Sequence, residues 1–289
     1  MPSTTTTPKL IIFSDLDGTL LDRDTYSFEP ALSALSLIKQ RGIPLILASS
    51  KTRAEIEFHQ EQLEMKHPFI SENGGAIFIP RGYFSFPFPF DKESEKYFIL
   101  ELGTSYPKIV EILNSIKNET TIPIKGFSDL TEEEVASLCG LSLKEAAFAK
   151  KREYDESFLI EGGEEEIEIV KEKIKERGMN YVWGGKFHHL LGKNDKGRGV
   201  EILKELFENE FFSISTLGIG DGPNDLPMLF VVDHPFFIKG EKTPLPESSS
   251  PIDNLTIIHG TGPHAWNQAI LDFFREEYRR PWRQTPKGS

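Results

Sequence analysis

Cysteine is almost absent from this chain of 289 residues, which contains only Cys139. A single cysteine excludes an internal disulfide and a site built from several thiolates, and it is typical of a protein in a reducing compartment. We interpret Cys139 as a packing residue, because an isolated thiol usually behaves as a small apolar side chain.

Long apolar runs are also missing from the sequence. The first residues, MPSTTTTPK, lack the basic start and the apolar stretch of a secretory signal, and no later segment is apolar over a length that spans a bilayer. We therefore expect a cytoplasmic protein that has no membrane partner.

Basic residues are outnumbered, because 33 Lys and Arg stand against 45 Asp and Glu and give a formal net charge of −12. This balance disfavours a general binder of polyanions, so we expect no nucleic-acid partner. A small anionic substrate is compatible with the same balance, since a few local cations and a metal ion can dominate the field inside a cleft.

The first part of the chain alternates strand-like and helix-like segments. Apolar runs at 9–14, 43–49 and 68–70 are typical of buried parallel strands, and helical patterns lie between them at 29–41 and 52–65. This alternation predicts a doubly wound α/β fold with a parallel sheet, whose functional loops lie at the carboxyl ends of the strands. The length of the chain favours two domains.

The texture changes after Pro80, where RGYFSFPFPF alternates aromatic residues with prolines. Prolines interrupt both central strands and helices, so we interpret this segment as a domain crossing. The alternative is an edge segment whose aromatic rings pack on the core. Neither interpretation assigns chemistry to the segment.

The middle of the chain predicts a separate α+β unit. Gly184 and Gly185 separate two strand-like runs and suggest a two-residue hairpin turn. After Gly192 the α/β alternation returns, so we assign residues 1–85 and 191–289 to the core and 86–190 to an insertion. Two capping boxes that each open a helix lie in the insertion, Thr131 with Glu134 and Ser142 with Glu145.

Two acidic loops carry the strongest functional signal. Asp15 and Asp17 follow the first apolar strand in FSDLDGTLLD, and Asp221, Asn224 and Asp225 follow a later strand in LGIGDGPNDLPML. Oxygen-rich loops that meet at one edge of a sheet suit Mg²⁺, which prefers oxygen ligands and takes one or two direct carboxylates. A bare Asp-x-Asp-Gly also occurs in ordinary turns, so each loop alone is moderate evidence.

Two further polar features lie between these loops. Ser49, Ser50 and Lys51 follow the strand IPLILA, and Lys196 opens the helix before the strand STLGIG. Hydroxyl groups and a lysine can hold phosphate oxygens. The alternatives are that the serines cap a helix and that Lys196 is a surface lysine.

Taken in this order, the four features resemble the haloacid dehalogenase-like phosphatase superfamily. Its pattern is DxDGT, a strand-end Ser or Thr, a Lys, and GDGxND. The resemblance covers the whole core, about two thirds of the chain, and it implies a Rossmannoid core with a parallel sheet and an inserted α+β cap. It also implies a Mg²⁺ cofactor.

The resemblance implies roles for the core residues. Asp15 would attack phosphorus and form an aspartyl-phosphate, and Asp17 would act as general acid and then base. Mg²⁺ would be held by Asp15, by Asp221 and by the main-chain carbonyl of Asp17. Lys196 and Ser49 would bind the phosphoryl oxygens.

The remaining residues of the GDGxND loop would act less directly. Asp225 would orient Lys196 and the loop from behind the metal ligands. Asn224 would either join the phosphoryl-binding groups or shape the turn.

Four shorter segments, SSKTRAE, ISENGG, KREYDESF and GGKFHHLLG, resemble the mannosyl-3-phosphoglycerate phosphatase family. This resemblance implies a small phosphorylated sugar acid as substrate, hydrolysed to a mannosyl- or glucosylglycerate, a compatible solute. The expected substrate-binding residues are Ser49, Ser50, Lys51, Arg152, Lys186 and His188. Lys186 and Ser157 depart from the Arg and Pro of the family pattern, so recognition of the carboxylate could differ.

The histidine pair in the last of these segments invites a metal-site interpretation. We do not expect His188 and His189 to share a metal, because neighbours on a strand face opposite sides.

Three other functions are open at this point. They are a broad sugar phosphatase, a phosphomannomutase-like phosphotransferase, and a binding module that has lost catalysis. The last is disfavoured because Asp15, Asp17, Lys196 and Asp221 are all present. The identity of the sugar and the oligomeric state do not follow from the sequence.

Overall fold

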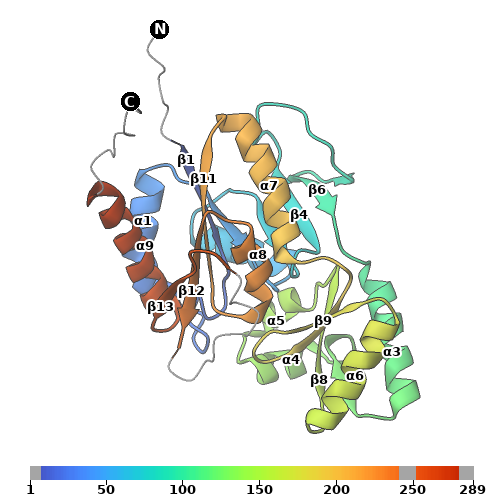
Figure 1. The fold of residues 1–289 in the computed structure, drawn as a ribbon. Helices are drawn as coiled ribbons and strands as arrows, with labels where there is room; N and C mark the ends of the chain where they lie inside the picture. The colour runs from blue at the N-terminus through green and yellow to red at the C-terminus, as the bar shows by residue number, and fades with distance from the viewer. Residues whose placement is uncertain (1–7, 241–251, 280–289) are drawn as a thin grey trace, which may run out of the picture.

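The computed structural model describes residues 8–240 and 252–279, and these ranges form two packed units (Figure 1). The larger unit is built on a sheet that has nine strands among the described residues, in the order β13-β12-β11-β1-β2-β3-β4-β6-β5. Its strands are β1 (Lys9–Ser14), β2 (Leu45–Ala48), β3 (Phe69–Ser71), β4 (Ala76–Pro80), β5 (Lys92–Glu93), β6 (Tyr97–Glu101), β11 (Ile214–Gly220), β12 (His234–Lys239) and β13 (Thr256–His259).

The strands from β13 to β3 run parallel, whereas β4, β6 and β5 are antiparallel. The expected α/β fold with a parallel sheet is confirmed. Because β1 lies between β2 and β11, the loops that follow these three strands open at one edge of the sheet.

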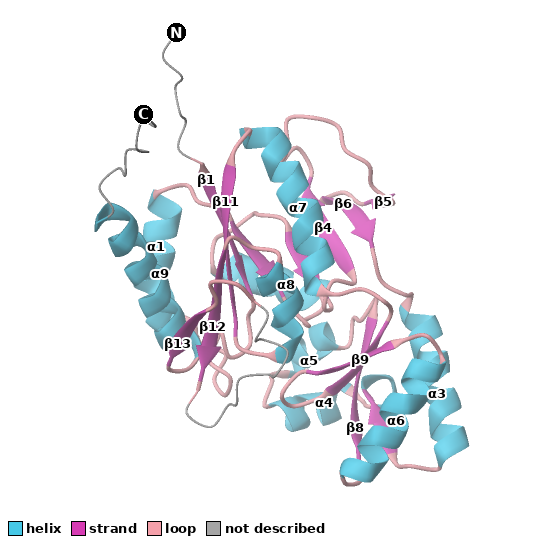
Figure 2. Ribbon diagram, viewed as in Figure 1, coloured by secondary structure: helices cyan, strands magenta, loops and turns pink. Residues whose placement is uncertain are grey.

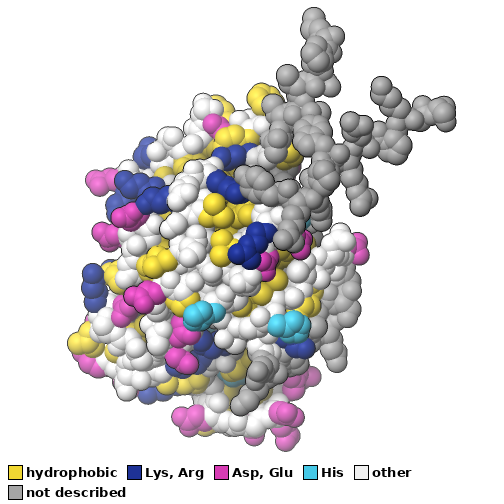
Figure 3. Space-filling model, turned by 90° about the vertical axis from the view of Figure 1, so that its left-hand side faces the viewer, with side chains coloured by type: hydrophobic (Ala, Val, Ile, Leu, Met, Phe, Trp, Pro, Cys, Tyr) yellow, Lys and Arg dark blue, Asp and Glu magenta, His cyan; other side chains and the backbone are white. Residues whose placement is uncertain are grey.

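Helices cover both faces of this sheet (Figure 2). One face packs against α1 (Leu32–Gln40), α2 (Arg53–Gln62) and α9 (Gly262–Arg279), where Trp266 is fully buried. The other face packs against α7 (Lys196–Phe211) and α8 (Leu226–Phe230). Acidic and basic side chains are interspersed on the side of the molecule that carries α1 and α9 (Figure 3).

The smaller unit is a cap with a four-stranded antiparallel sheet in the order β7-β8-β10-β9. Helices α3 and α6 pack on one face of this sheet through an apolar cluster, and α4 packs with α5. The cap elements are α3 (Tyr106–Thr120), β7 (Ile124–Gly126), α4 (Glu132–Cys139), α5 (Leu143–Ala149), β8 (Asp155–Ile160), α6 (Glu164–Glu176), β9 (Asn180–Trp183) and β10 (His188–Leu191).

The capping boxes predicted at the starts of α4 and α5 are confirmed. Thr131 and Ser142 each accept the main-chain N–H of the residue three positions later, and the glutamates there bond back to the capping residues. Short one-turn 3₁₀ segments occur at Glu29–Ala31, Phe127–Asp129 and Pro223–Asp225. Among the described residues, no helix is both long and apolar enough to cross a membrane.

The start of the cap differs from the division expected at residue 86. Strands β5 and β6 belong to the core sheet, so the chain leaves the core only after β6. The aromatic segment before them packs on the core, since Phe84 is 7% exposed and its ring centroid lies 5.2 Å from that of Phe207 on α7. This agrees with the alternative of an edge segment, because the prolines suit a connection beside the sheet rather than a strand within it.

The hairpin between β9 and β10 also differs from the expected two-residue turn. Trp183 pairs with His188, so four residues, 184–187, form the loop. The main-chain N–H of Gly184 donates to the carbonyl of Phe187 at 3.0 Å and closes it. Gly185 has a φ of +85°, which is the conformation that glycine adopts most easily. The glycine pair thus starts the turn but does not complete it.

Candidate active site

The two acidic loops meet at the carboxyl edge of the core sheet. Asp15 follows β1 and Asp221 follows β11, and these strands are paired in register, with Ser14 opposite Ile219. Oxygen atoms of Asp15, Asp221 and Asp225 all lie within 4.8 Å of one another. The parallel sheet therefore brings together the carboxylates of Asp15 and Asp221, which lie far apart in the chain.

Lys196 lies beneath this cluster and is completely buried. Its Nζ atom donates to Oδ1 of Asp15 and to Oδ1 of Asp225, each at 2.6 Å. Burial alone would lower the pKa of Lys196, but the two carboxylates outweigh burial and raise that pKa, so the side chain stays charged. Asp195 caps the helix by accepting the N–H of Arg198, which places Lys196 at the first turn of α7.

Burial and neighbouring negative charge also raise the pKa values of two acidic groups, which disfavours their charged forms. The pKa of Asp15 is raised to about 8, first by burial and then by the neighbouring charge of Asp225. The pKa of Asp221 is raised to about 6 by burial and by the same neighbour. Both carboxyl groups would be more stable as carboxylates if a cation lay between them, so the donor set suits a divalent metal ion.

Asp225 holds the loop together and has little capacity left for a ligand. Its Oδ2 atom accepts the main-chain N–H groups of Asp221 and Gly222 at 3.0 and 2.9 Å, and its Oδ1 atom accepts from Lys196. It is completely buried. Although its oxygens lie near those of the other two carboxylates, its hydrogen bonds suit the positioning of Lys196 and of the loop.

Asp17 faces Lys51 rather than the carboxylate cluster. The Oδ2 atom of Asp17 lies 3.0 Å from Nζ of Lys51, which is also 3.5 Å from Glu55. The Oδ1 atom of Asp17 is buried and has no hydrogen-bond partner among the described residues. A buried, unpaired carboxylate oxygen is costly, so this atom has the capacity to bind a further partner.

Residues 49–52, which follow β2, contribute both to the site and to the start of α2. Thr52, and neither serine, caps α2, in a reciprocal box with Glu55. Ser49 is buried, and its Oγ atom accepts the N–H of Lys51 at 3.2 Å. Ser50 lines the cavity described next.

A cavity of about 280 Å³ lies between the core and the cap. Asp15, Asp17 and Asp221 line it from the core, and Trp183 and Gly184 line it from the cap hairpin. A second cavity of about 300 Å³ shares several of these lining residues and extends toward Lys51 and Lys186. The predicted core residues and the cap hairpin thus enclose one region.

The expected cap residues are placed differently from one another. Lys186 is exposed and lines the second cavity. Arg152 also lines it but is buried and paired with Asp155 at 3.1 Å, and it donates to the carbonyl of Ser50. His188 lies on the other face of the cap sheet, where it contacts the hydroxyl group of Tyr181 at 2.6 Å.

His189 takes the position that was expected for His188. It lines the second cavity, and its Nδ1 atom lies 2.8 Å from Oδ1 of Asp155. The alternation of a strand predicts that the two histidines face opposite sides, but it does not say which one faces the core. That choice depends on the register of β10 with β8, which pairs His189 with Ser157.

Two further residues of this region, Arg23 and Asn73, were not predicted from the sequence. Arg23 pairs with Asp221 at 2.6 Å, and it follows closely on the acidic loop of β1. Asn73 accepts from Asn224 at 3.2 Å and donates to Asp155 at 2.9 Å. The segment ENGG was a usable signal for Asn73, whose φ of +55° marks a turn with a special conformation.

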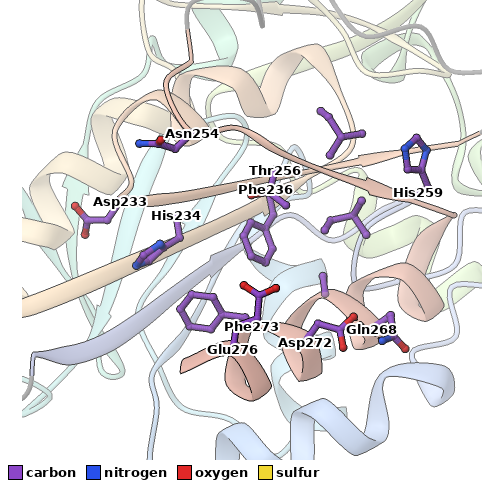
Figure 4. A pocket seen from close by; sticks show the side chains of 13 residues that line it. Asp233, His234, Phe236, Asn254, Thr256, His259, Gln268, Asp272, Phe273 and Glu276 are labelled. Atoms are coloured by element: carbon purple, nitrogen blue, oxygen red, sulfur yellow. Dashed lines mark hydrogen bonds between the residues drawn. The ribbon is translucent and has the colours of Figure 1, made fainter. Parts of the chain in front are cut away.

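A larger cavity of about 680 Å³ lies away from this region, between β12, β13 and α9 (Figure 4). Two of its polar side chains, Asp233 and His234, already have partners. Asp233 accepts from Thr216, and His234 contacts Ser215 at 3.1 Å. The acidic cluster lies elsewhere, so we assign the active site to the strand ends.

The fold and the site define the class of protein. The chain belongs to the haloacid dehalogenase-like hydrolase family, whose model matches residues 12–243. A solved structure of a haloacid dehalogenase-like hydrolase from Bacteroides thetaiotaomicron has the same fold, with a TM-score of 0.62 over 93% of this chain and all of the other, at 21% identity.

Two curated relatives narrow the class. The chain is 46% identical to a glucosyl-3-phosphoglycerate/mannosyl-3-phosphoglycerate phosphatase of Methanococcoides burtonii, over 91% of this chain and 97% of the relative. It is 38% identical to a mannosyl-3-phosphoglycerate phosphatase of Pyrococcus furiosus, over 79% of this chain and 90% of that protein. The chain is therefore an enzyme, a phosphatase of the haloacid dehalogenase-like hydrolase family.

Proposed function

We propose that the protein is a Mg²⁺-dependent phosphatase that hydrolyses mannosyl- or glucosyl-3-phosphoglycerate to the glycosylglycerate and phosphate. The observation that carries the proposal is the contact of Asp15 with Lys196 beside Asp221, in a cavity closed by the cap. The names of the two relatives support this choice of substrate.

The metal would be held by the carboxylates of Asp15 and Asp221 and by the main-chain carbonyl of Asp17. When bound, Mg²⁺ supplies positive charge that offsets these carboxylates and the charge of the phosphoryl group. The raised pKa values of Asp15 and Asp221 support the assignment, because they reflect negative charges that are buried together without enough compensation.

The chain's own residues would carry both chemical steps. An oxygen of Asp15 attacks phosphorus, the bond from phosphorus to the glycerate oxygen breaks, and Asp17 gives a proton to the departing oxygen. Water then attacks the phosphorus of the aspartyl-phosphate, Asp17 takes the proton, and Asp15 is released. The unpartnered Oδ1 atom of Asp17 supports its role in both transfers.

The substrate would be bound through its two anionic ends, the phosphoryl group and the glycerate carboxylate. Lys196 and Ser49 would hold phosphoryl oxygens, and Lys51 and Lys186 would attract the anionic glycerate end from the second cavity. Arg152 forms an ion pair with Asp155, so it would support this wall of the cavity and would not bind the substrate directly.

A phosphate-release assay tests the proposal. The purified chain is assayed with mannosyl- and glucosyl-3-phosphoglycerate, with Mg²⁺ and after its removal by a chelator. We expect turnover of at least one of the two esters only with the metal, and a loss of at least about 1,000-fold in Asp15→Asn. Equal kcat/KM on a panel of simple sugar phosphates would contradict the substrate, and full activity of Asp15→Asn would contradict the mechanism.

A further inference from the structure

We propose that His189 is a specificity-determining residue, whose Nε2 atom accepts a hydrogen bond from a hydroxyl group of the substrate's glycosyl unit. The inference rests on the proposed function and adds a contact to it. It starts from the position of His189 on β10, where the side chain is 5% exposed and lines the cavity that also contains Asp17 and Lys51.

Asp155 fixes the orientation of the imidazole ring. Its carboxylate is completely buried, and both of its oxygens lie near Nδ1 of His189, at 2.8 and 3.1 Å. A carboxylate accepts hydrogen bonds, so Nδ1 carries the proton in this pair, and Nε2 is the ring nitrogen left for a ligand. Arg152 and Asn73 hold the same carboxylate, at 3.1 and 2.9 Å, and keep it in place.

The Nε2 atom is free to bind a ligand. No hydrogen bond to it is found among the residues that the structure describes, although the Nδ1 atom of the same ring is fully engaged. The backbone of Gly184 approaches this atom closely, because a Cβ atom at that position would lie 2.6 Å from Nε2 and clash with it. Gly184 lines both cavities between the core and the cap and His189 lines the second, so Nε2 lies at the edge of the substrate region.

A chain of hydrogen bonds connects His189 to the core of the site. Asn73 donates to Asp155 and accepts from Asn224, which lies in the loop of Asp221. The main-chain N–H of Asn73 also donates to the carbonyl of Ser49 at 2.9 Å. His189 is therefore held at a defined place relative to the phosphate-binding end of the site. A residue that discriminates between substrates by their glycosyl end requires such a fixed position.

The chemistry of the cavity favours a hydroxyl group as the ligand of Nε2. The cations that line this cavity, Arg23, Lys51, Arg152 and Lys186, suit anionic groups, and Lys51 already engages the carboxylates of Asp17 and Glu55. In the neutral form of the ring, Nε2 has a lone pair and no proton, so it binds a hydroxyl donor and not a phosphate or carboxylate oxygen. A sugar offers several hydroxyl donors, and one of them would satisfy this atom.

The test uses two isosteric changes. In His189→Asn the amide N–H takes the place of Nδ1 and can still bond Asp155, whereas the Nε2 position is empty. We expect the KM for the glycosyl-3-phosphoglycerate that the wild type turns over to rise about fivefold to tenfold, the effect of one hydrogen bond. The kcat/KM for p-nitrophenyl phosphate, which has no sugar, should stay within about twofold. His189→Gln places an amide oxygen near the Nε2 position and should recover part of the KM.

The matched control is His188→Asn, since this neighbouring histidine lies on the other face of the cap sheet. An equal rise in KM in both variants would overturn the inference, as would an unchanged KM in His189→Asn. A fall in p-nitrophenyl phosphate hydrolysis in His189→Asn would also overturn it, because it indicates a structural role. Failure of the wild type on both glycosyl esters would instead contradict the proposed function.

Discussion

The Nζ atom of Lys196 lies 2.6 Å from an oxygen of Asp15, although 181 residues separate the two in the chain. Asp225 accepts from the same Nζ atom at the same distance, so one buried cation stands between two buried carboxylates. Such an arrangement is stable only while all three groups are present, because each charge would otherwise be left without compensation in the interior.

The first prediction follows from this contact. Lys196→Met leaves two buried carboxylates unpaired, so the free energy of unfolding in metal-free buffer at neutral pH should fall by about 3–5 kcal/mol, measured by urea denaturation. Adding Asp225→Asn removes one of these charges and should recover part of the loss. The exposed Lys193→Met is the control and should change stability by less than about 0.5 kcal/mol. Strictly additive losses in the double variant would contradict the coupling.

The elements that position Lys196 were predictable from the sequence, because apolar runs ending in polar residues define the strands of a parallel sheet. The four site features lie at one edge for the same reason. The contact of Asp225 with Lys196 depends on the packing of α7 against α8, so it follows from no local pattern, and only the family resemblance implied it. Sequence periodicity fixes which element a residue belongs to, and tertiary packing fixes its partner.

The cap was less predictable for a related reason. The aromatic segment after Pro80 carries strong turn signals, but the chain returns to the core sheet, where β6 pairs with β4 and β5 pairs with β6. In the same way, Arg152 in a charged segment looks like a free ligand group, whereas Asp155 neutralises it in the interior. Strand pairing and ion pairs between segments both depend on strand register, which a single sequence does not define.

Gly74 gives the second prediction, because it lies where the loop after β3 touches the start of α7. Its φ is +87°, and a Cβ atom would lie 2.0 Å from the carbonyl oxygen of Asp195. Gly74→Ala should therefore lower the free energy of unfolding by more than about 3 kcal/mol and slow phosphate release, since the backbone beside Lys196 must move. Gly82→Ala has a similar φ of +74° but open space around it, and should cost only about 1–2 kcal/mol. Equal thermal shifts in both variants would count against the close approach.

Phe84 gives the third prediction, which concerns the aromatic segment. Its ring is 7% exposed and contacts that of Phe207, so Phe84→Ala should lower the free energy of unfolding by about 3–5 kcal/mol through the cavity it creates. Phe90, at 43% exposed, contacts Phe98, and Phe90→Ala should cost at most about 1.5 kcal/mol. Both variants should keep the wild-type KM. A raised KM in Phe84→Ala would indicate that the segment binds substrate.

The last prediction concerns His67, which lies away from the acidic cluster and whose Nδ1 atom contacts the hydroxyl group of Tyr83 at 2.8 Å. Burial, with a smaller effect of Lys9, lowers the pKa of His67 from 6.5 to about 4. Between these values the unfolded chain binds a proton that the folded chain does not, so stability falls as the pH falls from about 6.5 to about 4, by about 1.4 kcal/mol per pH unit from this group. Urea denaturation across this range should therefore show a shallower pH dependence in His67→Gln than in the wild type, whereas the exposed His264→Gln should keep the wild-type slope. An unchanged slope in His67→Gln would mean that His67 is protonated in the folded protein at the same pH as in the unfolded chain.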